Sequence, residues 1–396
     1  MTEREPSWKD HADVLVIGGG IVGAACAYYL ARAGVAVRVL ERDFAASGTS
    51  RACDGLILYS DKLSSAELAL AEASADLWSE LAEALDTDFG YARRGTIVLY
   101  ESEEGLAAGR QKAAELQAAG VRSEILDGVG LRSLERSLAP DLAGGVYYLD
   151  EAQVDARLAT LAMLDAARRM GARLQPDTAV TGIRLDADGQ VCAVSTTQGD
   201  VPARKVICAA GVWSNDLARS AGVELPTRPR KGHILVTARA PGLIAHPMLE
   251  GSYAASVKSS AEDVQVALVA EMTAGGTMLL GSSREFAGYD RTVSPAVMQA
   301  IAARAMRFLP GLAQTTIIRS YAGLRPWSPD HLPLVGPVDA VPGLYMATGH
   351  EGAGIGLAPI TGQIVVQWIV EDKAPPLAES VRPGRFPLLT GERRSI

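Results

Sequence analysis

The stretch Gly18-Gly19-Gly20-Ile21-Val22-Gly23 decides the fold class of this chain of 396 residues. An apolar run at residues 13–17 precedes it, and an apolar segment at residues 21–33 follows it and stops at Gly34. This pattern predicts a buried parallel strand, a glycine turn and a helix. Because a second apolar run at residues 35–40 comes next, we expect a βαβ unit of the kind that binds dinucleotides.

The glycine turn carries the chemistry of such a unit. Gly18 permits the tight turn, Gly20 lets the backbone approach a pyrophosphate, and Gly23 lets the helix pack closely on the strand. The first helical residues, Ile21 and Val22, lie where free N–H groups and the helix dipole favour phosphate.

Glu41 ends the second strand, 18 residues after Gly23, where a carboxylate accepts hydrogen bonds from both ribose hydroxyl groups. The alternative is an ordinary glycine-rich turn with no ligand. The motif alone does not separate FAD from NAD, but its N-terminal position in a chain of this length favours FAD.

Composition and charge exclude several classes of protein. Apolar residues make up 48% and charged residues 21% of the chain, as in globular proteins, and the length predicts two to three domains. The net charge is −8 and the pI is near 5.3, without the basic patch that nucleic-acid binding requires. Four cysteines without a CxxC pair argue against a disulfide framework and against a zinc or iron–sulfur site within the chain. We expect no metal site, and thiols buried in a reducing compartment.

Two long apolar windows resemble membrane spans by length. The first, residues 14–31, contains four glycines and follows a segment with net negative charge, whereas a secretory signal needs a positive flank. The second, residues 355–370, contains Thr361, Gly362, Gln363 and Gln367 and reads better as a buried helix. We therefore expect no transmembrane segment and a cytoplasmic location.

The rest of the chain alternates between helical and extended patterns. Helices are predicted at residues 66–85, 104–119, 295–309 (after Ser294) and 359–371, and from Asp155 to about residue 170. Strands are predicted at residues 95–100, 144–148, 173–185, 191–196, 205–209 and 344–347, with a hairpin of residues 265–272 and 277–281. Residues 45–62 and most of residues 321–362 read as loops.

Three later stretches resemble one family of flavoenzymes. They are Cys208-Ala209-Ala210-Gly211-Val212-Trp213-Ser214, Ala322-Gly323-Leu324-Arg325-Pro326, and Thr348-Gly349-His350-Glu351-Gly352-Ala353-Gly354-Ile355-Gly356. With the βαβ unit, they resemble the D-amino acid oxidase/glycine oxidase/sarcosine oxidase family over residues 10–371. The resemblance implies non-covalent FAD and an α/β fold (α+β overall), in which a Rossmann-like FAD-binding domain is interleaved with an antiparallel-sheet substrate domain. We place the FAD-binding domain at residues 10–90, 150–225 and 320–380, and the substrate domain at residues 91–149 and 226–319.

The loop at residues 348–356 is expected to face the flavin. Gly352, Gly354 and Gly356 permit a backbone that lies against a flat ring, and the helix behind them, with Pro359 in its first turn, points its N-terminal dipole forward. In the family this end faces the flavin N1/C2 carbonyl, where it stabilises the charge of the reduced ring. The alternative is a glycine-rich turn before a core helix.

The resemblance also implies which other residues contact FAD. The loop after Glu41 wraps the pyrophosphate and the ring in the family, and Trp213 packs near the cofactor or in the plain core. The remaining residues that we expect at the cofactor are Arg42, Ser47, Thr49, Ser50, Val180, Gly211, Gly323, Arg325 and Ile355.

Candidates for catalysis and substrate binding surround Arg325. A planar guanidinium suits a bidentate grip on a carboxylate, and the family uses this arginine for the substrate α-carboxylate; the alternative is an ion pair with Asp330. Glu351 either meets a cationic group or caps its loop, and His350 is a catalytic candidate or a packing residue.

Two further regions are candidates for the substrate end of the site. Asp54 either reaches the substrate or shapes a turn. Tyr253 and His233 either line the pocket or lie in the core or at the surface.

One departure narrows the function. Relatives of the glycine oxidase type carry a second arginine in the flavin loop, where this chain has Gly352. The loop looks most like the β subunits of multisubunit opine oxidases/dehydrogenases, with hydrogen cyanide synthase and dye-linked proline dehydrogenase β subunits as relatives. Residues 231–233 and 281–286 are similar to that branch.

This branch implies oxidation of an amino or secondary amino acid at its C–N bond, with hydrolysis of the imine to an oxo acid and an amine. It also implies a hetero-oligomer whose electron-transfer subunits hold FMN or an iron–sulfur cluster. The alternatives are a single-chain glycine, sarcosine or D-amino acid oxidase, a proline or hydroxyproline dehydrogenase, a non-catalytic FAD subunit, and an NAD-dependent dehydrogenase.

Overall fold

A six-stranded sheet holds the N-terminal βαβ unit at its centre. The computed structural model describes residues 12–62, 64–387 and 389–390. Neighbouring strands of this sheet are parallel except for the pair β19–β20, and the order is β19-β20-β12-β1-β2-β8. The strands are β1 (Val14–Ile17), β2 (Val37–Leu40), β8 (Arg173–Gln175), β12 (Val206–Cys208), β19 (Leu334–Pro337) and β20 (Leu344–Thr348).

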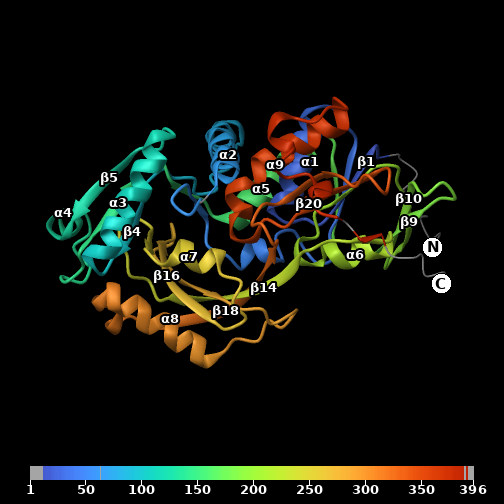
Figure 1. Ribbon diagram of the computed structural model, residues 1–396. Coiled ribbons are helices and arrows are strands. Elements are labelled where there is room, and N and C mark those ends of the chain that lie inside the picture. Colours follow the sequence, from blue (N-terminus) through green and yellow to red (C-terminus); the bar gives the residue numbers. More distant parts are fainter. Residues whose placement is uncertain (1–11, 63, 388, 391–396) are drawn as a thin grey trace.

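Successive side chains of β1 serve two different cores. Val14 and Val16 face the helix layer, whereas Leu15 and Ile17 join a cluster with the second layer, as the period of two in a strand requires. The helix layer consists of α1 (Ile21–Arg32), α2 (Ser65–Ala84), α5 (Ala156–Arg169) and α9 (Gly354–Val370), and α1 packs between α5 and α9 (Figure 1). The second layer consists of α6 (Ser214–Ser220) and the antiparallel strands β9 (Val180–Leu185), β10 (Val191–Thr196) and β11 (Gly199–Pro202).

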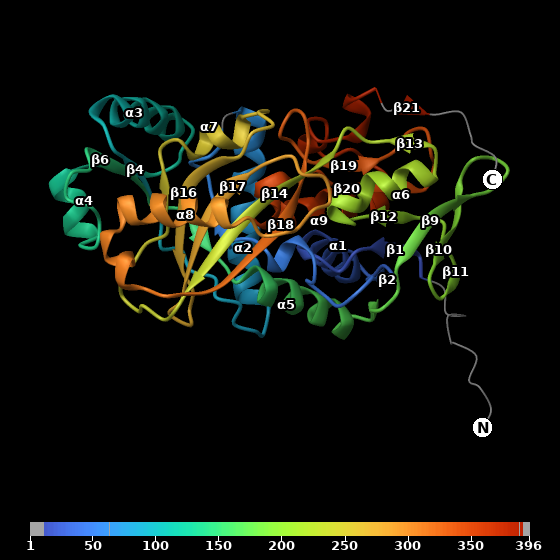
Figure 2. The same cartoon turned by 90° about the horizontal axis from the view of Figure 1, so that it is seen from below.

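An eight-stranded sheet forms the other large element, and its long strands β14 and β18 run past the first sheet (Figure 2). Its order is β18-β14-β17-β16-β15-β4-β6-β5, and only the pair β15–β4 is parallel. The strands are β4 (Thr96–Tyr100), β5 (Ser123–Asp127), β6 (Gly144–Tyr148), β14 (Arg228–Thr237), β15 (Met248–Glu250), β16 (Gln265–Met272), β17 (Met278–Arg284) and β18 (Ile317–Trp327).

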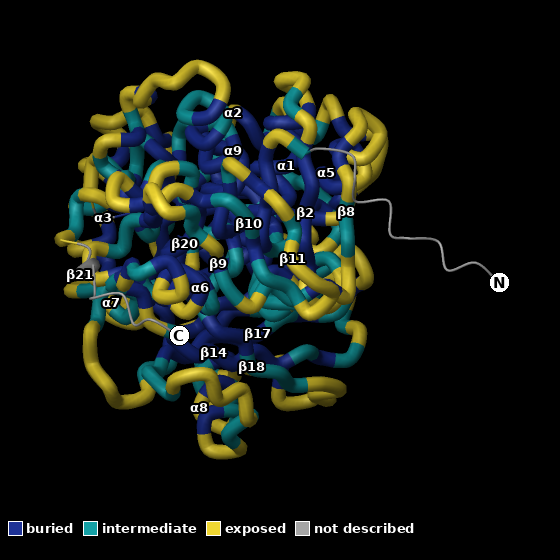
Figure 3. The backbone as a smooth tube through the Cα atoms, turned by 90° about the vertical axis from the view of Figure 1, so that its right-hand side faces the viewer, coloured by how far each residue is buried: buried dark blue, intermediate teal, exposed yellow. Residues whose placement is uncertain are grey.

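One face of the eight-stranded sheet packs against α8 (Pro295–Phe308), and the other faces the first sheet. Leu235, Leu268 and Leu280 join Ile301 of α8 in a separate core. Figure 3 shows β14 as largely buried, with exposed residues on the outer side of α8. The remaining elements are α3 (Glu103–Ala118), α4 (Gly128–Leu134), α7 (Tyr253–Lys258), β3 (Leu56–Ile57), β7 (Ala152–Gln153), β13 (Val223–Glu224) and β21 (Leu389–Thr390).

The predicted helix ends are confirmed where local chemistry sets them. Asp155 accepts a hydrogen bond from the backbone of Leu158, and Ser294 caps α8 with Pro295 at the first helical position. Gly34, with φ +80°, follows α1 in the left-handed conformation. The predicted fold class, parallel and antiparallel sheets in one interleaved chain, is confirmed as well.

The structure differs from the local predictions at several points. Arg325 lies inside the eleven-residue strand β18 and not in a loop. The segment at residues 121–143, for which no structure was predicted, contains β5 and α4, and the predicted loop at residues 45–62 contains β3. Helix α9 begins at Gly354, so Pro359 lies in its second turn and not in its first.

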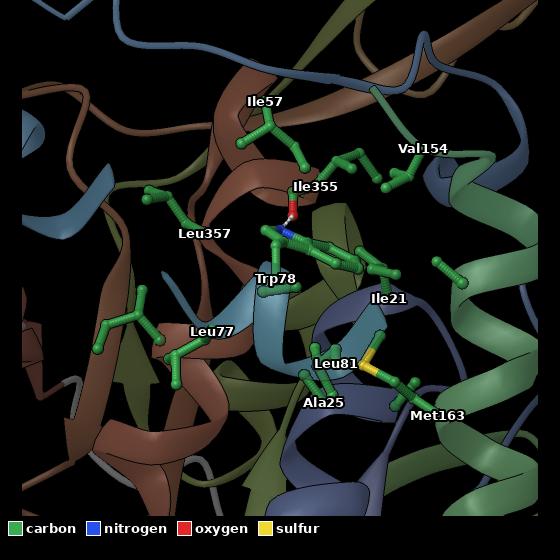
Figure 4. Packing of buried hydrophobic residues seen from close by; sticks show 14 of the residues in the cluster. Ile21, Ala25, Ile57, Leu77, Trp78, Leu81, Val154, Met163, Ile355 and Leu357 are labelled. Carbon is green, nitrogen blue, oxygen red and sulfur yellow. Dashed lines mark hydrogen bonds between the residues drawn. The ribbon is translucent and has the colours of Figure 1, made fainter. Parts of the chain in front are cut away.

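Helix α2 compensates for the proline within α9. Pro359 has no N–H group to donate to Ile355 O, the carbonyl four residues earlier. Instead, Trp78 Nε1 lies 3.2 Å from Ile355 O (Figure 4). The same nitrogen lies 3.1 Å from Gly356 O, and Ser74 Oγ donates to Gly356 O at 2.6 Å. The start of α9 is therefore fixed by a contact with a distant part of the chain.

Among the described residues, one helix, Glu351–Val370, is long and apolar enough to cross a membrane by composition alone. It packs on α1 and α2, and 56% of its apolar window is buried within the protein. This is the arrangement of a core helix. All four cysteines are free thiols.

Candidate active site

A cavity of about 360 Å³ lies between the carboxyl ends of β1, β12 and β20 and the inner face of the eight-stranded sheet. Most of the residues expected at the cofactor or substrate line it. They are Gly18, Gly20, Ile21, Val22, Glu41, Arg42, Ser47, Thr49, Ser50, Asp54, Val180, Gly211, Trp213, Tyr253, Gly323, Arg325, His350, Glu351, Gly352, Gly354 and Ile355. Further lining residues that the sequence analysis missed include Cys53, Thr178, Thr181 and Asp216.

The glycine turn is so tight that no side chain fits at two of its positions. A Cβ atom on Gly23 would lie 2.0 Å from Gly18 O, and one on Gly18, where φ is +106°, would lie 2.6 Å from Ala209 O. Gly23 does not line the cavity, because it serves the contact between helix and strand. Gly20 does line it, which leaves the backbone open to a ligand at the start of α1.

Glu41 holds this turn from the end of β2. One of its carboxylate oxygens accepts a hydrogen bond from Gly19 N at 2.6 Å, and the other accepts from Asp43 N at 2.9 Å. Ser50 Oγ accepts from Ile21 N at 2.9 Å and so supports the first helical turn. A buried carboxylate beside an open glycine turn fits the adenosine ribose and pyrophosphate of a dinucleotide.

Trp213 forms a wall at the nucleotide end of the cavity. The Arg42 guanidinium lies 3.9 Å from the centre of its ring, and Tyr289 stacks on it with ring centres 6.3 Å apart. Tyr289 also donates to Asp216 at 2.6 Å. Trp213 therefore lines the cavity within an aromatic and cationic stack and is not a plain core residue.

The loop before α9 is open at one of the positions that the sequence analysis assigned to the flavin. No atom lies within 4 Å of a Cβ placed on Gly352. Glu351, beside it, has a φ of +47°, a conformation that a non-glycine residue keeps only when its surroundings enforce it. Gly356 lines a smaller neighbouring cavity instead of the main one.

Glu351 is held in that conformation by two partners from its own chain, Arg230 and His331. Arg230, whose side chain is 1% exposed, donates to one carboxylate oxygen at 2.6 Å, and His331 Nδ1 lies 2.9 Å from the other. Burial alone would raise the pKa of Glu351, but the His331 hydrogen bond and the Arg230 charge outweigh it and lower that pKa. The cationic group that Glu351 meets, Arg230, therefore belongs to its own chain.

Arg325 presents its guanidinium to the cavity from β18. The group lies against the backbone of Gly232 on β14, where a Cβ atom would be only 2.1 Å from Nη1. Nη1 donates to Ser283 O at 3.0 Å, and no carboxylate of a described residue lies within ion-pair distance of Arg325. The alternative ion pair is wrong, because Asp330 binds Arg385 at 2.7 Å.

Asp54 lies near Arg325 with a second buried carboxyl group behind it. Glu271, 5% exposed on β16, accepts from Gly55 N through both oxygens at 3.2 Å. Burial is the main cause that raises the pKa of Asp54, and burial together with the Asp54 charge raises the pKa of Glu271 to about 8. Burial and Asp54 also raise the pKa of Cys53 well above its usual range, so this thiol is not ionised.

Two histidines of the sequence analysis have structural partners. His350 Nε2 bonds to Thr361 Oγ1 at 2.9 Å, and burial lowers the pKa of His350 to about 3, so the ring is neutral. His233 points to the other face of its sheet, where it bonds to Ser283 Oγ and accepts from Ser294 N at 3.1 Å. It does not line the cavity, whereas Tyr253 does.

No pattern in the sequence predicted a role for Arg230, Arg284 or Glu271. Each is a buried charged residue in a strand whose residues are mostly buried. A charged residue within such a strand is the feature of the sequence that could have identified these three residues, because an ionised group is buried only where it has a partner or a function.

Comparisons with known proteins agree with this geometry. The model of a family described as FAD dependent oxidoreductase matches residues 13–368. Glycine oxidase from Geobacillus kaustophilus is 32% identical over 368 residues, which cover 91% of this chain and 93% of that protein. Hydrogen cyanide synthase subunit HcnC from Pseudomonas aeruginosa is 29% identical, with 92% and 93% covered. The chain spans about half the length of another relative, the bifunctional protein ThiO/ThiG from Nostoc, at 30% identity.

Solved structures give the same picture. Glycine oxidase from Bacillus cereus superposes with a TM-score of 0.83 at 28% identity, covering 98% of this chain and all of that chain. Iminodiacetate oxidase from Chelativorans superposes with a TM-score of 0.80 at 25% identity, covering 93% of this chain and 98% of that chain.

Proposed function

Because this chain belongs to the FAD-dependent oxidoreductase family of D-amino acid oxidase, we propose that it oxidises the C–N bond of an opine-like secondary amino acid. As in its homologues, the cofactor is FAD, and the enzyme class is that of FAD-dependent oxidoreductases acting on amines and amino acids. The substrate, the subunit role and the residues named below are the parts that we propose.

The nucleotide end of the cavity fits FAD through the chain's own groups. We propose that Gly20 and the N-terminus of α1 bind the pyrophosphate and that Glu41 binds the adenosine ribose. The stack of Trp213 and Arg42 borders the same end of the cavity. FAD supplies the two-electron acceptor that takes a hydride from the substrate carbon. No covalent link is expected, because no cysteine lies in residues 348–356.

The observation that carries the proposal is the unpaired guanidinium of Arg325. A buried cation without a carboxylate partner is costly, and a substrate carboxylate supplies the missing charge. The missing side chain at Gly232 leaves the space that the Arg325 guanidinium occupies. The guanidinium therefore binds the carboxylate in one orientation, which fixes the direction of the neighbouring carbon. Positioning of this kind contributes most of the rate, and no dedicated base is required.

We propose that Asp54 receives the substrate amine. It lines the same cavity as Arg325, and its carboxyl group accepts an N–H group of the amine or the proton that an ammonium ion gives up on binding. The amine must be neutral when hydride leaves, because its lone pair stabilises the forming imine. Water then splits the imine into an oxo acid and an amine.

A secondary amine and a partner subunit are favoured by two comparisons and one substitution. The solved relative that is named for iminodiacetate acts on a secondary amine, and HcnC is named as a subunit. Gly352, in place of the second arginine of the glycine oxidase pattern, leaves room beside the loop for a second substituent on nitrogen. We therefore propose a cytoplasmic β subunit whose partners hold FMN or an iron–sulfur cluster.

The decisive experiment is anaerobic reduction of the purified yellow protein. We expect an opine to bleach the flavin faster than glycine, sarcosine, proline or hydroxyproline. Glycine as the best substrate would support the single-chain oxidase instead, and no bleaching by any amine would support a non-catalytic FAD subunit. Acid precipitation should leave a yellow supernatant, since colour in the pellet would indicate covalent FAD.

The subunit proposal has its own test. Purification from the native source at low salt, followed by mass analysis of the co-eluting proteins, should find electron-transfer subunits. A homo-oligomer that turns over rapidly with oxygen alone would contradict this proposal.

A further inference from the structure

Three arginines face the same side of the eight-stranded sheet on three adjacent strands. Arg284 lies near the end of β17, Arg230 on β14, and Arg325 on β18, directly opposite Arg230. Of these, Arg230 is neutralised by Glu351 at 2.6 Å. Neither Arg284 nor Arg325 has a carboxylate within ion-pair distance among the described residues. Arg325, which lines the cavity, and Arg284, which lies beside the lining residue Tyr253, are therefore two buried positive charges without a paired negative charge.

The guanidinium of Arg284 is buried without an anionic partner, and such burial costs free energy. The residue is 2% exposed, and its Nε has no hydrogen-bond partner. Nη1 donates only to hydroxyl groups, Ser256 Oγ at 2.9 Å and Ser282 Oγ at 3.3 Å. Nη2 donates to no described residue, yet it is not sealed from solvent as Nε is. Neutral hydroxyls leave the charge uncompensated, and an anion would compensate it.

The position of Arg284 connects it to the cavity. Its guanidinium lies 4.5 Å from the ring centre of Tyr253, which lines the cavity. Arg325 bonds to the carbonyl of Ser283, the residue just before Arg284. The charge of Arg284 lowers the pKa of Arg325, after the larger effect of burial, and it also lowers that of Asp54 against burial. Two guanidinium groups thus lie within electrostatic range of one carboxyl group, that of Asp54.

We propose that Arg284 binds a second carboxylate of the substrate, so that the site accepts a secondary amine flanked by two carboxylates. This inference rests on the proposed function and deepens it. Arg325 then takes the carboxylate next to the oxidised carbon, Asp54 faces the central nitrogen, and Arg284 takes the carboxylate of the other arm. The order of charges in the site, positive, negative, positive, is complementary to that of the substrate.

Binding of a matched pair of inert ligands tests this role without turnover. Oxydiacetate carries two carboxylates and an ether oxygen in place of nitrogen, and ethoxyacetate has a methyl group in place of one carboxylate. With the FAD-loaded full chain, calorimetry should give a dissociation constant roughly tenfold or more lower for oxydiacetate. Arg284→Gln should bring the ratio of the two constants close to one, chiefly by weakening oxydiacetate binding.

Three further variants separate binding from structure. Arg284→Lys keeps the charge and should keep part of the preference, which decides the question if the glutamine variant fails to fold. Ser256→Ala removes a hydroxyl partner of Arg284 and leaves its charge, so the preference should remain. Arg110→Gln makes the same change in net charge on exposed α3 and should leave both constants unchanged. An equal loss for both ligands in Arg284→Gln, or no preference in the natural protein, would overturn the proposal.

A kinetic comparison distinguishes failure of this inference from failure of the proposed function. Iminodiacetate and N-ethylglycine form the corresponding pair of amines for anaerobic flavin bleaching. If both bleach the flavin with equal efficiency and Arg284→Gln affects them equally, the amine oxidation stands and the role of Arg284 is refuted. If neither bleaches, the proposed function is refuted, and the binding ratio alone decides whether Arg284 recognises a carboxylate.

Discussion

The two ends of the cavity are built by different means. At the nucleotide end, a stretch of six residues contains four glycines, and the absence of a side chain is essential at Gly18 and Gly23, as the 2.0 Å approach at Gly23 demonstrates. At the substrate end, charged side chains from β14, β17 and β18 and from the loop around Asp54 meet across long sequence separations. The first end depends on backbone geometry and the second on charge. Substitutions should therefore remove the cofactor at one end and alter substrate recognition at the other.

The largest effect is expected for Gly23→Ala at the nucleotide end. The new methyl group would meet a backbone carbonyl that cannot move away, so we expect a loss of at least about 3 kcal/mol in stability and little bound FAD. Flavin absorbance per chain and the melting temperature measure both. Gly34→Ala is the matched control, because no atom lies within 4 Å and only the positive φ of +80° costs about 1–2 kcal/mol. Equal effects of the two variants would contradict a steric role for Gly23.

At the substrate end, Arg325→Met should raise KM by roughly a hundredfold, corresponding to about 3 kcal/mol for a charged bidentate contact, with normal FAD content. Gly232→Ala should shift the same guanidinium and raise KM less, since a Cβ there reaches only the flexible end of Arg325. Steady-state kinetics and the flavin spectrum check both variants. Loss of flavin from Arg325→Met would show that the two ends are not separate.

A smaller effect is expected for Glu41→Ala, at the nucleotide end. The loss of a charge-assisted contact of about 1.5–3 kcal/mol should weaken FAD binding roughly tenfold or more. FMN lacks the adenosine ribose, so its affinity reports only the loosening of the turn that Glu41 holds through Gly19 N. Titration of the apoprotein with each flavin gives the comparison, and an equal loss for both would exclude the ribose role.

The smallest effect concerns the pH dependence contributed by Glu271. Its pKa is raised to about 8 in the folded protein, so the folded chain keeps a proton that the unfolded chain loses above about pH 4.5. The stabilisation is complete below that pH and is lost as pH rises towards 8. Glu271→Gln should therefore flatten the fall in melting temperature over this range by a few degrees. Glu151, whose pKa burial raises to about 7, leaves a weaker trend in both proteins. Parallel curves would refute the assignment to Glu271.

Sequence reasoning succeeded where neighbours along the chain determine the outcome. The βαβ unit, the caps at Asp155 and Ser294, and the tight glycine turn beside the cavity follow from local patterns. It failed for the strand that carries Arg325, because Gly323 and Pro326 resemble loop residues. Strand β18 is the edge of its sheet, where proline is tolerated.

The charged groups of the substrate end could not be paired from the sequence alone. Glu351 was expected either to meet a cationic group or to cap its loop, and its partners Arg230 and His331 come from different segments of the chain. The same holds for Glu271 and Gly55, which are 216 residues apart. Pairings of this kind depend on the register in which the strands pair. The hydrophobic pattern does not specify this register for β14 and β18, because glycine and arginine occupy inward positions of both strands.

The contact between Trp78 and Ile355 has a consequence for the synthesis of the protein. The two residues are 277 positions apart, so the indole leaves the ribosome long before the carbonyl that it must meet. Strand β20 and helix α9, which complete the parallel sheet and the loop beside the cavity, are made after every other strand of that sheet. A nascent chain that ends before residue 344 lacks both elements. The cavity is therefore complete only after residues 344–370 have been made, and until then helix α2 lacks the α9 surface that it packs against.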